Sequence, residues 1–218
     1  MSKVLFTIAS VLLFILPAQA MDVVDGHLEV IESFGHSGKI IEGSDGRTID
    51  IVGDVSYSAN NTGVAKGNSY RIDIDVVLNE AEFWLDFSDS QILTYYVFDC
   101  PTEFGTYSEV YRDSEEVTGS GAGWYSSGAL SIDMYTGTHY IIIVSWDGNM
   151  TYFFGVGESQ DTSFGAHTHG YASGSDPLPS SFESTSNDQA IYHQRLTTVE
   201  IGALEMSTWG AIKACLTE

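Results

Sequence analysis

The sequence predicts an all-β protein, an antiparallel β-sandwich of the jelly-roll type. Short runs of alternating apolar and polar residues recur between clusters of Gly, Asn, Asp and Ser, which is the pattern of half-buried antiparallel strands. Residues 21–203 contain no long stretch with the one-sided apolar spacing of an amphipathic helix. About nine to eleven short strands favour a sandwich over a parallel α/β sheet.

The alternation is clearest at residues 82–87, where Phe83, Leu85 and Phe87 share one side. Residues 92–98 are more continuously apolar, as expected of a central strand. The stretch after Gly157 is polar and rich in Gly and Ser, so a loop is predicted there. Strands are predicted at residues 27–31, 48–52, 70–76, 82–87, 92–98, 107–111, 129–134, 140–146, 151–156 and 190–201.

Residues 139–146 and 150–156 form the best predicted β-hairpin in the chain. Their connector is Asp147-Gly148-Asn149, and a glycine in a short loop supplies the positive φ that tight connections require. A further turn is predicted at residues 43–46, between the first two strands.

Residues 1–20 are predicted to be a cleaved export signal. Lys3 supplies the positive start, residues 4–16 are almost wholly apolar, and Ala18-Gln19-Ala20 places small residues where a signal peptidase cuts. About thirteen apolar residues are too few for a membrane span, which needs roughly 20. We therefore expect a secreted protein (extracellular, periplasmic or attached to the cell surface) whose mature form has no membrane span.

One β-sandwich domain is expected at residues 21–203, followed by a tail at 204–218. In the tail Trp209, Ile212 and Leu216 have the one-sided spacing of a helix, so a short C-terminal helix is predicted. The formal net charge of −22 argues against nucleic acid as a partner, because phosphate binding requires clustered Lys and Arg. The oligomeric state stays open.

Cys100 and Cys215 both lie in the exported part of the chain. An even pair in an oxidising compartment favours one disulfide. It would close a loop of roughly 115 residues, worth about 4–5 kcal/mol in the chain-entropy model. An unpaired or intermolecular Cys215 is the alternative.

The middle third of the chain resembles a family of bacterial modules. Its segments NEAEFWLDF, ILTYYVF, GTYSEVY, GWYSSGALSI and HYIIIVSWDGNMTYFF follow one another between residues 78 and 154. Their order is similar to that of jelly-roll modules in secreted and surface proteins, in the style of pre-peptidase C-terminal domains. The resemblance implies adhesion, targeting or substrate binding, sometimes with calcium. The tail segment STWGAIKA also resembles a short C-terminal motif of exported proteins.

Two sets of residues are candidate metal ligands. His167 and His169 would share one face of an extended stretch, and with His193 on a neighbouring strand they would suit zinc. Asp73 and Asp75 would share a strand face near Asp86, Asp89 and Asp99, and calcium prefers such oxygen ligands. No cofactor is certain; calcium is the favoured candidate and zinc the less favoured one. The alternatives are an incidental histidine loop and a solvated acidic surface.

Trp84, Trp124 and Tyr125 are the candidate ligand-binding residues. Trp84 falls on the polar side of its strand, and exposed rings on a β-sheet can form platforms for sugars or partner surfaces. The alternative is that these rings pack in the core, as expected for Trp146.

No nucleophile elbow, zinc-protease motif or phosphate-binding loop is present in the sequence, so we do not expect an enzyme. The leading hypothesis is a non-catalytic secreted binding or adhesion module for carbohydrate, a cell surface or a protein. One alternative is a self-assembling structural subunit of a surface layer or filament. The other is a metal-dependent hydrolase or lyase that uses His167, His169 and His193.

Overall fold

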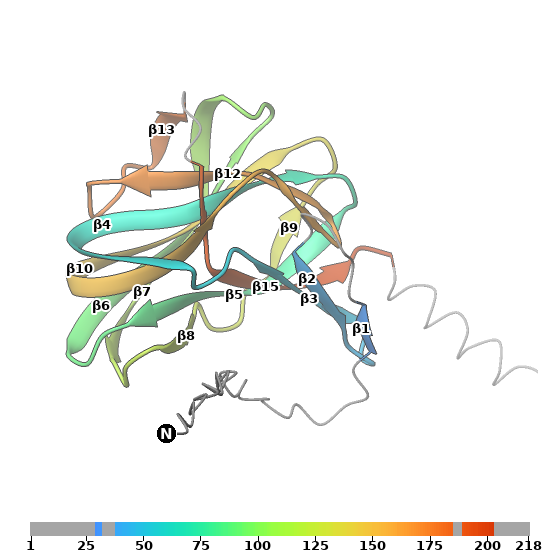
Figure 1. Cartoon of the computed structure of the whole chain (residues 1–218). Coiled ribbons are helices and arrows are strands. Elements are labelled where there is room, and N and C mark those ends of the chain that lie inside the picture. The colour runs from blue at the N-terminus through green and yellow to red at the C-terminus, as the bar shows by residue number, and fades with distance from the viewer. Residues whose placement is uncertain (1–28, 32–37, 185–188, 203–218) are drawn as a thin grey trace, which may run out of the picture.

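The protein was analysed as a computed structural model, which describes residues 29–31, 38–184 and 189–202. The described part contains fifteen β-strands and no helix, so the all-β prediction is confirmed (Figure 1). The strands are β1 (Glu29–Ile31), β2 (Lys39–Glu42), β3 (Arg47–Val52), β4 (Tyr57–Ile72), β5 (Val76–Asp86), β6 (Ser90–Cys100), β7 (Gly105–Thr118), β8 (Gly123–Ser126), β9 (Ile132–Met134), β10 (His139–Val156), β11 (Gln160–Thr162), β12 (Gly165–Ser173), β13 (Ser181–Ser184), β14 (Ala190–Tyr192) and β15 (Gln194–Glu200).

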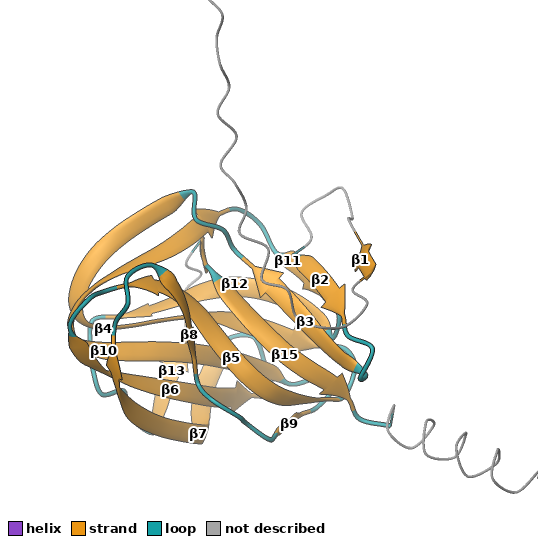
Figure 2. Cartoon of the chain, turned by 90° about the horizontal axis from the view of Figure 1, so that it is seen from below, coloured by secondary structure: helices purple, strands orange, loops and turns teal. Residues whose placement is uncertain are grey.

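All strand pairs are antiparallel, and the strands form one hydrogen-bonded sheet that nearly closes into a barrel. Its main path runs β1-β2-β3-β15-β5-β10-β4-β12-β11. The arrangement therefore differs from a sandwich of two separate sheets. Strand β10 pairs with β4 along nearly its whole length. On its other edge, the first half of β10 pairs with β6 and the second half pairs with β5 and β14, so β10 connects these parts of the sheet. Figure 2 shows β2, β3, β15 and β5 side by side on one side of the barrel, with β8 next to β5.

The predicted hairpin at residues 139–156 is wrong, because β10 runs through it as one strand. The register to β4 shifts between Trp146 and Asn149, so Asp147-Gly148-Asn149 forms a bulge rather than a reversal. Strand β6 provides the partners for this bulge. Gln91 Oε1 accepts the Gly148 N–H at 2.9 Å, and Asp147 Oδ1 accepts the Ile92 N–H at 3.0 Å.

Three other predictions differ from the structure. Residues 70–76 are not one strand: β4 ends at Ile72 and the chain turns there, with the N–H groups of Asp73 and Ile74 donating to Phe164 O. The predicted loop after Gly157 contains β11, β12 and β13. The last strand is interrupted at His193. The export signal (1–20) and the C-terminal helix (204–218) lie outside the described residues.

The core follows from strand alternation. On β10, Tyr140, Ile142, Val144 and Trp146 point into the large interior cluster, which also holds Tyr70, Leu78 and Phe83. The intervening Ile141 and Ile143 face a second cluster with Tyr96, Phe98 and Cys100. Residues 93–98 of β6 and 140–146 of β10 are buried on both faces, which agrees with their mostly apolar sequences. Among the described residues, no helix is long and apolar enough to cross a membrane.

Gly67 is predicted to be essential for the approach of β4 to β10. A Cβ atom there would lie 2.2 Å from the backbone oxygen of Ile142, which cannot move away without disturbing the ladder. We expect Gly67→Ala to lower the free energy of unfolding by about 1–3 kcal/mol, as measured by urea denaturation. Gly123→Ala is the control, since nothing lies within 4 Å of its added Cβ and its φ is not in the left-handed region. Equal stability of the two variants would contradict the prediction.

Candidate functional site

Two of the three predicted ligand-binding aromatics lie together on the outside of the barrel. Trp84 on β5 and Trp124 on β8 are directly paired across the strands, and both side chains are partly exposed. Their ring centroids are 5.3 Å apart and the ring planes meet at 83°. Tyr125, the next residue on β8, faces the interior: it is 8% exposed, its ring lies 4.5 Å from that of Phe87, and its hydroxyl donates to Gly121 O at 2.7 Å.

The ring of Trp124 contacts two side chains that come from the other side of β5. Its ring centroid lies 4.7 Å from that of His193 and 4.8 Å from Cζ of Arg195. Arg195 in turn donates hydrogen bonds from Nε and Nη2 to the two carboxylate oxygens of Glu82. Glu82, Trp84, Trp124, His193 and Arg195 are called the Trp124 cluster below.

His193 is held in the cluster by its backbone. It lies between β14 and β15, where its carbonyl accepts the Trp84 N–H at 3.0 Å and its N–H donates to Phe153 O at 3.0 Å. Its ring nitrogen Nδ1 lies 3.3 Å from Val52 O. Burial lowers the pKa of this imidazole below its ordinary value. The neutral ring therefore serves as a packing partner of the two tryptophans.

His167 and His169 do not share a face, contrary to the sequence prediction. The register between β12 and β4 shifts between them, so that His167 is opposite Tyr70 and His169 is opposite Ser69. This bulge at Thr168 reverses the alternation that would have placed both rings on one side. His167 packs edge-on against Tyr70 in the interior, at 6.0 Å.

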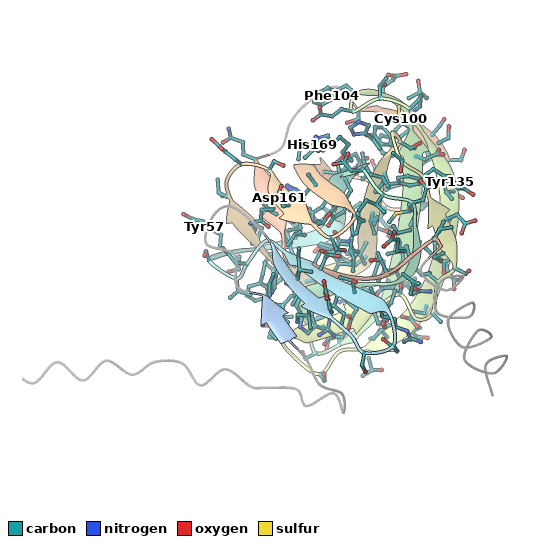
Figure 3. All side chains as sticks on the ribbon, turned by 90° about the vertical axis from the view of Figure 1, so that its right-hand side faces the viewer. Tyr57, Cys100, Phe104, Tyr135, Asp161 and His169 are labelled. Carbon is teal, nitrogen blue, oxygen red and sulfur yellow. The ribbon has the colours of Figure 1, made fainter. Side chains whose placement is uncertain are left out.

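His169 lies on the other face of β12, against the β6–β7 connection. Its ring stacks on that of Phe104, with the ring centroids 5.2 Å apart; both residues are labelled in Figure 3. The ring nitrogen Nδ1 lies 3.5 Å from Glu103 Oε1 and 3.1 Å from Thr168 Oγ1. A hollow of about 270 Å³ lies beside residues 167–169, Gly157, Glu158, Ser159 and Gln189. The ring nitrogens of His167 have no accessible surface, so they do not reach it.

Asp73 and Asp75 lie in the β4–β5 turn rather than on a strand face. Asp73 accepts two hydrogen bonds from Arg71, at 2.9 and 2.8 Å, and these lower the pKa of its carboxyl. Asp75 Oδ1 accepts the Thr136 N–H at 2.7 Å, which lowers its pKa in the same way. Within the described residues, no three His, Cys, Asp or Glu side chains form a group that could hold a metal ion.

Cys100 is buried in the second cluster, with Sγ 3.6 Å from Thr102 Oγ1. Its predicted partner Cys215 lies outside the described residues, so the disulfide stays a prediction.

Sequence reasoning missed the two buried acidic groups of the structure. Glu82 is hydrogen-bonded to Arg195, and Asp50 is hydrogen-bonded to Ser163. In each pair the two residues are 113 positions apart, so no local sequence pattern indicates the contact. Asp50 accepts hydrogen bonds from Ser163 N and Oγ, both at 2.6 Å, and is 1% exposed. Burial raises the pKa of its carboxyl to about 6.

The fold and this site define an antiparallel β-barrel-like protein with an aromatic cluster on its outer surface. No protein-family model and no curated protein matches the chain. A solved structure with distant similarity to this chain contains the cysteine protease and lectin-like domains of Cwp84, a surface layer associated protein of Clostridium difficile. The identity is 13% and the TM-score is 0.46. The match covers 74% of this chain and 38% of that one, so this chain spans well under half of that protein.

Proposed function

We propose that this chain is a non-catalytic secreted binding module and that the Trp124 cluster binds carbohydrate. The observation that carries the proposal is the position of Trp124. Its ring starts on β8, contacts the side chains of His193 and Arg195 on the other side of β5, and remains partly exposed. The exposed part of this ring offers apolar surface for stacking on the apolar face of a sugar.

The cluster is also held rigidly. Glu82 is paired with Arg195 through two hydrogen bonds, and the side chains are only 10% and 26% exposed. Arg195 then lies over the Trp124 ring, while Trp84 contacts it at a right angle. A ring fixed before binding loses little conformational entropy when a ligand arrives, which favours affinity.

The same contacts favour binding over catalysis. Glu82 is the only carboxylate of the cluster, and both of its oxygens are bonded to Arg195. A general acid or base needs a carboxyl that can exchange a proton with the substrate. An ion-paired Glu82 supports the platform instead.

We expect Trp124→Ala to weaken glycan binding at least ten-fold. Loss of the stacking surface removes roughly 1.4 kcal/mol or more, which corresponds to that factor. A glycan array first identifies a bound oligosaccharide, and titration calorimetry with that oligosaccharide then compares the variants. Tyr135→Ala is the matched control, because Tyr135 is 52% exposed and lies outside the cluster. Wild-type affinity in Trp124→Ala, or no bound glycan on the array, would refute the proposal.

A further inference from the structure

The charges around Trp124 restrict which glycan can bind there. Cross-strand pairing places Ser126, Glu82, Arg195, Ile51 and Lys39 in one row across β8, β5, β15, β3 and β2. Side chains paired in this way share one face of the sheet, so the row lies beside the two tryptophans. Its central cation, Arg195, is neutralised by Glu82 through two hydrogen bonds.

In the part of the chain that the structure describes, the other charges close to the cluster are negative. Ser126 Oγ donates to the carboxylate of Glu80, which places that charge next to Glu82 on β5. The charge of Asp54 acts on the imidazole of His193. Lys39 lies two strands from Arg195, roughly 10 Å at the usual strand spacing, which is somewhat more than the Debye length of about 8 Å at physiological ionic strength. The chain as a whole carries a formal charge of −22.

The two rings also restrict the shape of the ligand. Because their planes meet at 83°, Trp84 and Trp124 cannot both lie flat against one planar surface. The flat face of a crystalline polysaccharide requires coplanar rings. A single hydrated sugar unit can instead stack on Trp124 with its edge towards Trp84.

We infer that the ligand of the Trp124 cluster is an uncharged, soluble glycan chain, bound through one stacked sugar ring. This inference rests on the proposed function. Anionic glycans are excluded because, among the residues that the structure describes, no unpaired cation lies at the cluster, and the surrounding negative charges repel such glycans. The site then selects neutral over anionic glycans by charge, in addition to binding a sugar ring by stacking.

The test compares soluble xylan and galactomannan fragments, alginate, chondroitin sulfate and microcrystalline cellulose. Each is measured with the wild type and with Trp124→Ala, at low and at high NaCl concentration. We expect binding to at least one neutral soluble glycan that changes less than two-fold with salt and falls at least ten-fold in Trp124→Ala. Glu80→Gln removes one negative charge beside the cluster at nearly constant side-chain size: it should leave the affinity for the neutral glycan within two-fold.

The outcomes distinguish the proposed function, carbohydrate binding at the Trp124 cluster, from the inference that only neutral, soluble glycans bind there. Trp124-dependent binding to alginate, chondroitin sulfate or cellulose would overturn the inference and leave the proposed function standing. Binding to no glycan in the set or on the array would overturn both. Salt-sensitive binding to the neutral glycan would also overturn the inference, because it would show that charge contributes to recognition.

Discussion

Replacing Trp146 with alanine is expected to lower the free energy of unfolding by about 3–5 kcal/mol, the usual range for a buried large aromatic. Trp146 is fully buried at the bulge of β10, its ring lies 5.7 Å from that of Tyr152, and its indole N–H donates to Asn61 O at 3.0 Å. The substitution leaves a cavity and an unpaired carbonyl in the interior. Urea denaturation followed by far-UV circular dichroism measures the change.

Trp146→Phe separates the two causes of that loss. Phenylalanine retains a ring in the core but has no N–H for Asn61 O, so we expect a smaller loss of about 1–3 kcal/mol. Equal losses in both variants would show that the hydrogen bond, not the packing, dominates. A loss below about 1 kcal/mol in Trp146→Ala would contradict the observed burial.

Below neutral pH, two buried groups are expected to make pH-dependent contributions of opposite sign to the free energy of unfolding. The first comes from Asp50, whose burial raises the pKa to about 6 from 3.8. Between these values the folded state holds a proton that the unfolded state has lost. Raising the pH from about 4 to about 6 therefore lowers stability through Asp50, by up to about 3 kcal/mol.

The second term comes from His167 and has the opposite sign. Burial, together with the nearby His169, lowers the pKa of its imidazole to about 4 from 6.5. Between these values the unfolded state binds a proton that the folded state does not. Lowering the pH from about 6.5 to about 4 therefore lowers stability through His167, again by up to about 3 kcal/mol.

Single substitutions should expose each term. In Asp50→Asn the His167 term remains, so the free energy of unfolding should rise with pH between 4 and 6.5 more steeply than in the wild type. In His167→Phe only the Asp50 contribution remains. The free energy of unfolding of this variant should therefore fall, relative to the wild type, as the pH rises from 4 to 6. Urea denaturation at half-unit pH steps measures both slopes, and constant offsets from the lost contacts do not affect them.

The double variant is the control for this experiment. If the two groups act independently, Asp50→Asn combined with His167→Phe should restore a slope close to that of the wild type. Slopes of both single variants that parallel the wild type would contradict the burial of these groups.

Much of the fold was predictable from alternation. Residues 82–86 of the predicted strand 82–87 lie in β5 and residues 92–98 lie in β6, because side-chain alternation is a local property of an extended chain. The segment 139–156 was misread because its glycine resembles a turn residue. Whether that glycine ends a strand or sits in a bulge depends on Gln91 and on β4, which are distant in sequence.

The candidate site was predictable only in part. Trp84 was identified because it is an aromatic on the polar side of a predicted strand, and Trp124 because it is one of several candidate aromatics; the structure pairs the two. The orientation of Tyr125 follows from β8, which the sequence did not reveal as a strand. His193 was assigned to a candidate zinc site with His167 and His169, whereas the structure places its ring beside those of the two tryptophans.

By itself the sequence determined the all-β class, the negative charge and the expectation of export, which reflect composition and neighbouring residues. The tertiary structure alone decided the near-closed sheet, the opposite faces of His167 and His169, and the Glu82–Arg195 support of Trp124. The reason is physical. Alternation specifies which side chains share a face of one strand, but strand partners, bulges and register are set by contacts between segments far apart in the chain.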